Sequence, residues 1–311
     1  MSKVKLEFCV GPGGIPATVE EWAPFCRMLE DLGYTAVSNG DHPAMPRLGA
    51  IASTAAAAAA TSQIRVGTLV YGNDYRHPLV LAREIATLDR MCGGRVEFGL
   101  GAGWYTADYE QFGWTWDRPG VRIERLAEAV QLVKRYFSGE RFSLQGKHYS
   151  VRDVEGYPLP IQRPYPTLVM GGGGPKMLAL AGREADIVDF NFALQSGNMT
   201  DWSGPTATRE STRVKLAAVH EGAKGRAVKP KLSVTLHGLG LTGDLDAAAA
   251  KAAKFYSLSV EQLRDSPHFV FGDKAAAVDK LLRLREEYGF TRINLSGTMI
   301  NEAAPLVREL G

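Results

Sequence analysis

Strand-like and helix-like segments alternate along almost all of this 311-residue sequence. Short runs rich in β-branched and aromatic residues are each followed by a longer run with apolar residues three or four positions apart, which is the pattern of β-α units. This alternation constrains the fold more than any other feature. The segments expected to form strands are Val4–Val10, Ala36–Asn39, Ile64–Val70, Arg95–Leu100, Thr167–Met170, Asp186–Phe192, Lys231–Leu241 and Arg292–Ser296.

Three segments break the alternation. Phe142–Pro166 contains four prolines, which predicts a hairpin and an irregular crossing loop. An extra helical excursion is expected over residues 245–266, and the polar stretch Gln195–Pro205 is expected to be mobile. The expected helices of the regular pattern are Thr18–Gly33, Leu48–Thr61, Pro78–Met91, Val121–Phe137, Lys176–Ala185, Thr208–Lys224, Lys274–Tyr288 and Glu302–Leu310.

Eight strands separated by helices leave no length for a second core. The sequence therefore predicts an α/β protein that folds as a single (β/α)8 TIM barrel over residues 1–311. A doubly wound parallel sheet is the alternative, and it needs fewer strands and a crevice where the strand order switches. In a barrel the C-terminal strand ends share one face, so the chemistry is expected at those ends.

Composition and charge exclude several classes of partner. The 36 basic and 34 acidic residues leave a net charge of +2, which is smaller than expected for a protein that binds nucleic acid through a basic surface. The first apolar run is broken by charged residues, so no signal peptide is expected, and no run reaches the roughly 18 apolar residues of a membrane span. Three unclustered cysteines indicate neither a disulfide framework nor a zinc site. A cytoplasmic protein without a metal is expected.

The stretch from Arg90 to Trp104, RMCGGRVEFGLGAGW, predicts a helix end, a tight turn, a strand and a glycine-rich mouth at Gly101–Gly103. Glycines in such a place let the backbone approach a ligand closely. Trp104 begins an aromatic loop that offers flat surfaces to a cofactor or a substrate. The later Trp114 and Trp116 are interpreted as residues that cap the barrel.

A second glycine cluster, Gly171, Gly172, Gly173 and Gly174, lies between a predicted strand and a helix. The free N–H groups and the positive dipole end of that helix would suit an anion such as a phosphate. A tight turn would need only one or two glycines, so four predict the close approach of another group. Neither glycine cluster completes the GxGxxG fingerprint, which disfavours direct NAD(P) binding in a Rossmann manner.

Asp41 and His42 follow the second predicted strand. Histidine has an ordinary pKa near 6.5, so His42 could donate or accept a proton around neutral pH. The alternative is that Asp41 braces the loop and His42 only hydrogen-bonds within it. His77 precedes a proline at a helix start and is interpreted as structural, and the remaining histidines (His148, His220, His237 and His268) have no partner motif.

The segment LDRMCGGRVEFGLGAGW, followed by RIERLAEAVQLVKRYF, resembles the luciferase-like monooxygenase superfamily of flavin- and deazaflavin-dependent barrels. The resemblance extends to IRVGTLVYGNDYRHPLVLAREIATLDR and to VMGGGGPKMLALAGREADIVDF, and it covers most of residues 1–192. Within the superfamily the sequence looks most like the branch that uses coenzyme F420, an 8-hydroxy-5-deazaflavin. FMN is the alternative cofactor.

The resemblance implies a place for each part of the cofactor. Its phosphate would lie at Gly171–Gly174, and its ring would lie against Leu69, Val70 and Tyr71, where the superfamily has a bulge that often contains a cis non-proline peptide. Asp41 and His42 would contact the ring system. Relatives that oxidise sugar phosphates have a glutamate where this sequence has Trp104, which puts that substrate in doubt. Trp104 is then expected to wall the ring pocket, and His42 is the predicted proton donor or acceptor.

The function that the resemblance implies is hydride transfer between coenzyme F420 and a small organic substrate, in an enzyme that is expected to form a homodimer. An FMN-dependent monooxygenase that uses oxygen is the nearest alternative. An aldolase or isomerase could use the same phosphate loop, but it would want a lysine or a carboxylate pair at the strand ends, and no lysine stands there. A catalytically silent flavin-binding relative also stays open.

Overall fold

The computed structural model of the chain describes residues 5–194, 197–198 and 204–311. Within these residues eight parallel strands form a closed ring, in which β3 pairs with β2 on one side and with β5 on the other. The predicted (β/α)8 barrel is confirmed. The strands of the ring are β1 (Glu7–Val10), β2 (Ala36–Asn39), β3 (Arg65–Thr68), β5 (Val96–Gly101), β8 (Thr167–Gly172), β9 (Ile187–Phe190), β10 (Lys231–Thr235) and β13 (Phe290–Leu295).

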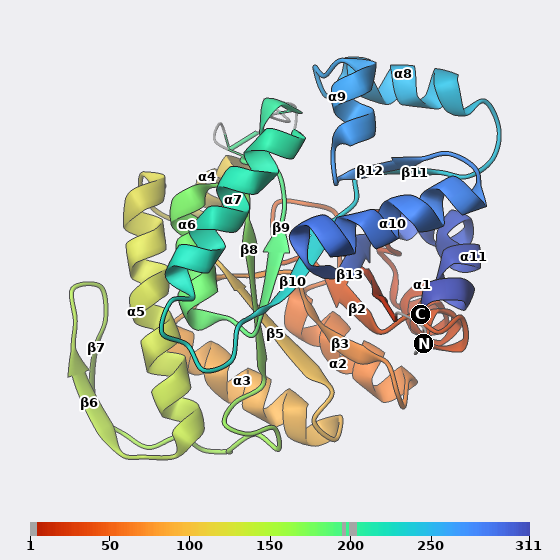
Figure 1. Cartoon of the computed structure of the whole chain (residues 1–311). Coiled ribbons are helices and arrows are strands. Elements are labelled where there is room, and N and C mark those ends of the chain that lie inside the picture. The colour runs from red at the N-terminus through yellow and green to blue at the C-terminus, as the bar shows by residue number, and fades with distance from the viewer. Residues whose placement is uncertain (1–4, 195–196, 199–203) are drawn as a thin grey trace.

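Helices surround the ring of strands (Figure 1). Apolar side chains on the outer face of the strands pack against them, as Phe98 does against Phe137 at a ring-centroid distance of 6.0 Å. The alanine-rich helix α2 packs on α1, where Trp22 donates a hydrogen bond to the carbonyl of Ser53. The surrounding helices are α1 (Val19–Asp31), α2 (Ala50–Ala60), α3 (Pro78–Met91), α5 (Pro119–Ser138), α6 (Pro175–Glu184), α7 (Arg209–Gly222), α10 (Lys274–Tyr288) and α11 (Ile300–Leu310).

The chain breaks its regular path after β3. The Leu69–Val70 peptide bond is cis, and the chain then resumes as β4 (Tyr71–Gly72), which pairs with the end of β5. A single turn of 3-10 helix, η1 (Asn73–Tyr75), follows. The cis non-proline peptide expected at this strand end is therefore present, and the break between β3 and β4 stands where a bulge was expected.

The seventh strand is shorter than predicted. After β10 the backbone N–H of His237 bonds to the carbonyl of His268, and Gly238–Gly240 forms β11, which pairs with β12 (Phe269–Phe271) outside the ring. The sequence prediction joined β11 to β10 and missed β12. Between these two short strands lies the predicted helical excursion, α8 (Leu245–Phe255) and α9 (Val260–Asp265), which is set apart from the ring at the top of Figure 1.

Two other predicted departures can be compared with the structure. β6 (Phe142–Gln145) and β7 (Ser150–Val154) form the predicted antiparallel hairpin. The expectation about Gln195–Pro205 concerns residues that lie mostly outside the described part of the chain. None of the helices in that described part is both long and apolar enough to cross a membrane.

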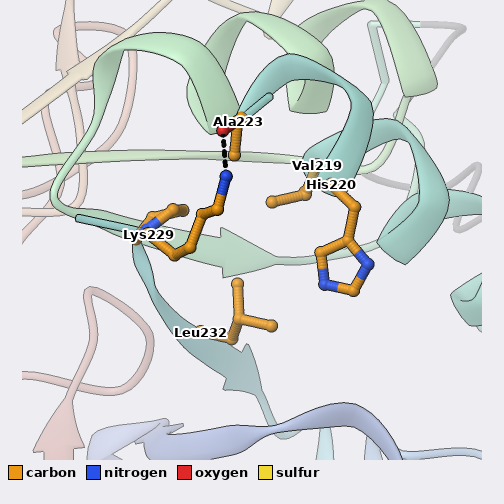
Figure 2. Close-up of a pocket in the computed structure, with 6 residues that line it drawn as sticks. Val219, His220, Ala223, Lys229 and Leu232 are labelled. Atoms are coloured by element: carbon orange, nitrogen blue, oxygen red, sulfur yellow. Dashed lines mark hydrogen bonds between the residues drawn. The ribbon is translucent and has the colours of Figure 1, made fainter. Parts of the chain in front are cut away.

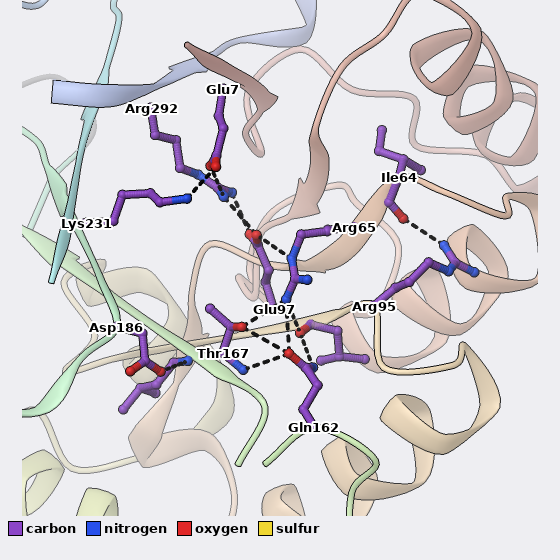
Figure 3. Close-up of polar contacts among 12 residues, drawn as sticks. Glu7, Ile64, Arg65, Arg95, Glu97, Gln162, Thr167, Asp186, Lys231 and Arg292 are labelled. Atoms are coloured by element: carbon purple, nitrogen blue, oxygen red, sulfur yellow. Dashed lines mark hydrogen bonds and ion pairs between the residues drawn. The ribbon is translucent and has the colours of Figure 1, made fainter. Parts of the chain in front are cut away.

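Charged side chains fill the end of the barrel where the strands begin (Figure 3). Arg292 Nη1 lies 2.8 Å from Glu97 Oε1, and both side chains are buried. Arg65 donates to the same carboxylate and also to Thr167. Burial raises the pKa of Glu97, but Arg292 and Arg65 lower it more, so the net shift is downward. This network closes the barrel floor and leaves the opposite end, where the strands finish, for the site.

Candidate active site

His42 stands at the end of β2, with its side chain 16% exposed. Its Nδ1 lies 2.6 Å from Oδ2 of Asp108, whose side chain is fully buried. Because an ionised carboxylate can only accept hydrogen bonds, Nδ1 carries the shared hydrogen, and Nε2 is left as the ring position for proton exchange. The structure therefore gives the predicted histidine an acidic partner that orients its ring.

Asp108 belongs to α4 (Thr106–Phe112), the helical turn that follows β5. Its carboxylate also accepts from the hydroxyl of Tyr75 at 2.7 Å and from the backbone N–H of Ala44 at 3.0 Å. Burial raises the pKa of Asp108, but these three hydrogen bonds outweigh it, so the pKa falls below its ordinary value. Asp108 is thus an ionised anchor shared by three strand-end loops.

Two aromatic rings meet the edge of His42. The ring centroids of Trp104 and Tyr105 lie 5.3 and 5.9 Å from that of His42, both in near-perpendicular orientation. Trp104 and His42 come from the ends of β5 and β2, so the structure brings together two residues predicted from separate motifs. Their rings form one wall of the barrel mouth.

Asp41 braces the loop beside the mouth. Arg76 donates to both of its carboxylate oxygens, at 2.9 and 3.1 Å, and the backbone N–H of Gly72 donates at 3.0 Å. This is the bracing role considered as the alternative from the sequence. A direct contact between Asp41 and a cofactor stays a prediction.

The bulge after β3 presents its residues in different directions. Leu69 lies near Gly11 at the end of β1, which places its side chain on the inner side of the barrel. Tyr71 is fully buried, with its hydroxyl 3.4 Å from Thr54 Oγ1 of α2, so its ring points away from the mouth. Any part that Tyr71 takes in the predicted ring pocket belongs to its backbone.

The structure gives a packing reason for the glycines of the segment Gly101–Gly103. A Cβ on Gly101 would overlap the side chain of Val70, and a Cβ on Gly103, whose φ is +72°, would overlap the hydroxyl of Tyr109. The space that a side chain would need at these two positions is therefore occupied by Val70 and Tyr109. The close approach of a ligand to this segment stays a prediction.

The glycines after β8 differ in how closely the protein packs around them. A Cβ on Gly172 would press on Met177, and a Cβ on Gly173 would overlap the backbone of Phe192. Gly174 instead faces open space and is the N-cap residue of α6, which no side chain caps. The N-terminus of this helix thus stands where a phosphate site was predicted, and phosphate binding there stays a prediction.

Arg122 is a buried cation at the same end of the barrel. It lies in the first turn of α5, where it packs against the rings of Tyr109 and Trp116. Its guanidinium stacks 3.5 Å from the ring centroid of Trp116, and its Nε and Nη1 atoms have no hydrogen-bond partner among the described residues. A buried guanidinium with free N–H groups is suited to an oxyanion.

The other aromatic residues of this loop have structural roles, as interpreted from the sequence. Trp114 stacks on Tyr75 at 4.6 Å, and Trp116 packs on Tyr109 and Arg122. They cover the helical side of the mouth and support the residues that hold Asp108.

Two other histidines have roles apart from the unit of His42 and Asp108. His77 caps α3 by accepting from the N–H of Leu79, which confirms its structural interpretation. His220 lines a surface cavity of about 360 Å³ with Lys229 and Leu232 (Figure 2). Because Lys229 and Leu232 flank the beginning of β10, this cavity lies away from the strand ends that carry His42.

Sequence reasoning missed three residues of the site. Asp108 and Tyr75 complete the hydrogen-bonded unit of His42, and Arg122 supplies the buried cation. A signal was present for Asp108, because it is an acid four residues after Trp104 at a predicted strand end. Arg122 stood in the regular pattern of a helix, where nothing distinguished it from a surface arginine.

Comparison with known proteins identifies the family of this chain. The model of the family described as "Luciferase-like monooxygenase" matches residues 5–291. The chain is similar to an F420-dependent glucose-6-phosphate dehydrogenase of Microbacterium testaceum, with 32% identity over 56% of this chain and 54% of the relative. It is also similar to an FMNH2-dependent dimethylsulfone monooxygenase of Pseudomonas putida, with 26% identity over 68% of this chain and 54% of the relative. The chain thus spans about half the length of both relatives.

A solved structure supports the fold over the whole chain. The coenzyme F420-dependent tetrahydromethanopterin reductase of Methanopyrus kandleri superposes with a TM-score of 0.76, covering 99% of this chain and 98% of that one. The two sequences are 20% identical, so this likeness supports the fold alone.

Proposed function

Because this chain belongs to the luciferase-like monooxygenase family, we propose that it is an oxidoreductase that transfers a hydride between coenzyme F420 and a small organic substrate. The observation that carries the proposal is the hydrogen-bonded unit of His42 and Asp108 at the mouth of the barrel. A partly exposed histidine held by a fully buried acid is suited to proton transfer beside a redox cofactor.

The residues present fit the cofactor. The uncapped terminus of α6 at Gly174 would hold its phosphate. The backbone of the bulge at Leu69–Val70 and the ring of Trp104 would hold its ring system. When bound, the deazaflavin supplies a ring carbon, C5, that accepts or gives the hydride.

The chain's own residues would orient the reactants and exclude water. His42 exchanges a proton with the substrate through Nε2 while Asp108 holds the ring in one orientation. Trp104 and Tyr105 cover the edge of the imidazole and shield the reacting atoms from solvent. Asp41 contributes by fixing Gly72 and Arg76 after the bulge, with a direct contact to the cofactor ring as the predicted further role.

The choice of F420 is supported by the higher identity to the F420-dependent relative than to the FMNH2-dependent one, 32% against 26%. An FMN-dependent monooxygenase is the second candidate, because the phosphate site and ring pocket described above would serve either cofactor. In both cases the partner is a small molecule. We propose further that the enzyme is a single-domain barrel that works as a homodimer in the cytoplasm.

Parallel titration with the two cofactors tests the proposal. Purified protein is mixed with oxidised F420 in one series and with FMN in another, and the quenching of cofactor fluorescence is followed. We expect saturable binding of F420 and weaker binding of FMN. Micromolar binding of FMN without binding of F420 would contradict the deazaflavin assignment and favour the monooxygenase.

A further inference from the structure

Arg47 is a cation at the barrel mouth that the proposed reaction does not use. It lies on the loop between β2 and α2, five residues after His42. Its guanidinium reaches back over the ends of β1 and β2, where Nη1 faces the carbonyl of Pro12. A Cβ on Gly40 would overlap Nη1 of Arg47, so the guanidinium occupies a space that only glycine leaves free.

The hydrogen bonds of Arg47 are weak for a guanidinium. Nη1 lies 3.4 Å from the Pro12 carbonyl oxygen, and Nη2 lies 3.3 Å from the sulfur of Met45. Nε is buried without a partner among the described residues. A guanidinium offers five N–H donors in a planar fork, so most of its capacity is unused.

Two other arginines near the strand ends are paired with carboxylates. Arg76 contacts both oxygens of Asp41, and Arg125 contacts Asp74 and Asp117. No described carboxylate forms an ion pair with Arg47, although the charge of Asp108 acts on it through space. Burial lowers the pKa of Arg47 and Asp108 raises it, which leaves the net shift downward. An added anion would favour the charged form.

The loop that carries Arg47 is fixed relative to His42. Asp108 accepts from both His42 Nδ1 and the backbone N–H of Ala44. Within the loop, the N–H of Met45 bonds to the carbonyl of His42, and the N–H of Arg47 bonds to the carbonyl of Met45. The proton-exchanging group and the unpaired guanidinium are therefore held by one anchor.

From these contacts we propose that Arg47 binds an oxyanion of the substrate, so that the natural substrate is a small carboxylate or phosphate ester. The inference rests on the proposed function, because it takes the reacting atoms to lie beside His42. The guanidinium pairs with two oxygens of the anion through its planar fork. This contact positions the uncharged end of the substrate toward His42.

The test uses inorganic phosphate as the probe, with sodium chloride at equal ionic strength as the blank. Binding is measured by calorimetry and by tryptophan fluorescence, since Trp104 lies against His42. Four proteins are compared, each with and without bound F420: the wild type, Arg47→Gln, Arg47→Lys and Arg27→Gln. Arg27 is exposed on α1 and serves as the matched control.

We expect saturable phosphate binding by the wild type with F420 bound. Arg47→Gln should weaken it by about tenfold or more, Arg47→Lys should weaken it less, and Arg27→Gln should leave it unchanged. The proposal is overturned if Arg47→Gln binds phosphate as the wild type does, or if the F420-bound wild type binds no phosphate above the chloride blank.

Two further outcomes separate this proposal from the cofactor assignment. A loss of F420 affinity in Arg47→Gln would show that the guanidinium serves the cofactor, which overturns the substrate role. If the wild type binds neither F420 nor FMN, the proposed function fails on its own. The comparison of wild type and Arg47→Gln in cofactor-free protein then decides the anion site, with equal binding counting against it.

Discussion

At the scale of single residues, the site is a set of charged groups whose partners come from distant parts of the chain. His42 was predicted from its place at a strand end, but its partner Asp108 is 66 residues away and stood in the predicted aromatic loop. Arg47 and Arg122 were not predicted, because a sequence does not show which arginines lack a carboxylate. Residue type and position thus indicated the histidine, and only packing revealed its surroundings.

His42→Ala should lower turnover by about 10²–10⁴ while F420 affinity stays close to that of the wild type, since the change removes proton transfer and little binding surface. The measurement is steady-state turnover beside equilibrium fluorescence titration. His220→Ala, on the exposed surface near the opposite end of β10, is the control and should change neither value. Unchanged turnover in His42→Ala would remove this residue from the mechanism.

At the scale of elements, strong local patterns predicted the structure well. The bounds of β2 (Ala36–Asn39), α3 (Pro78–Met91) and α10 (Lys274–Tyr288) agree with the expected ones at both ends. The prediction of one strand over Lys231–Leu241 was wrong. The strand-like pattern continues from β10 into β11, but the chain leaves the barrel between them. Whether a strand pairs inside or outside the ring depends on distant partners such as β12, which the local sequence does not contain.

The glycine loop after β8 offers a matched pair of substitutions. Gly173→Ala should weaken F420 binding by about tenfold or more, because the new Cβ overlaps the Phe192 backbone and displaces the loop before α6. Gly174→Ala faces open space with an ordinary negative φ and should bind nearly as the wild type does. Fluorescence titration measures both variants. Equal affinities in the two would argue against this loop as the phosphate anchor.

At the scale of the whole molecule, the ends of the barrel have different roles. The floor is closed by Arg292 and Glu97, which are 195 residues apart in sequence, and the mouth carries the candidate site. The order of strands and helices was enough to predict the barrel, and the placement of the chemistry at the ends of the strands stays a prediction. The ion network of the floor could not be predicted. In the sequence, each of its residues resembles a surface charge at the beginning of a strand.

Glu97→Gln should destabilise the fold by about 3 kcal/mol or more, because it leaves the buried Arg292 without its main carboxylate partner. Asp153→Asn removes an exposed partner of Arg141 and should cost less than about 1 kcal/mol. Urea unfolding followed by circular dichroism compares the two variants. Similar small losses in both would mean that the floor network contributes no more than a surface pair.

Two buried histidines predict how stability depends on pH. Burial and the nearby Lys215 lower the pKa of His237 to about 3, and burial lowers that of His268 well below its ordinary value. Both rings stay neutral in the fold, whereas histidines of the unfolded chain take up protons near pH 6.5. The contribution of these rings to the free energy of unfolding should therefore be complete above about pH 6.5. Below that pH the free energy of unfolding should fall by up to about 1.4 kcal/mol per pH unit for each ring.

Urea unfolding at pH 7, 6 and 5 measures this dependence. His237→Gln should flatten the decline, because glutamine can keep a hydrogen bond to Asn191 and does not titrate. His220→Gln, on the surface, should leave the decline as it is in the wild type. A decline as steep in His237→Gln as in the wild type would show that this ring is not the source.

The central claim is that the barrel mouth binds coenzyme F420 by both its ring and its phosphate. Equilibrium titration of the wild type with F420, and with the same deazaflavin chromophore lacking the phosphate-bearing tail, tests this claim most directly. We predict that both bind and that loss of the tail weakens binding by about tenfold or more, since the contacts at Gly174 and the first turn of α6 are removed. Equal affinities, or no binding of F420, would contradict the account.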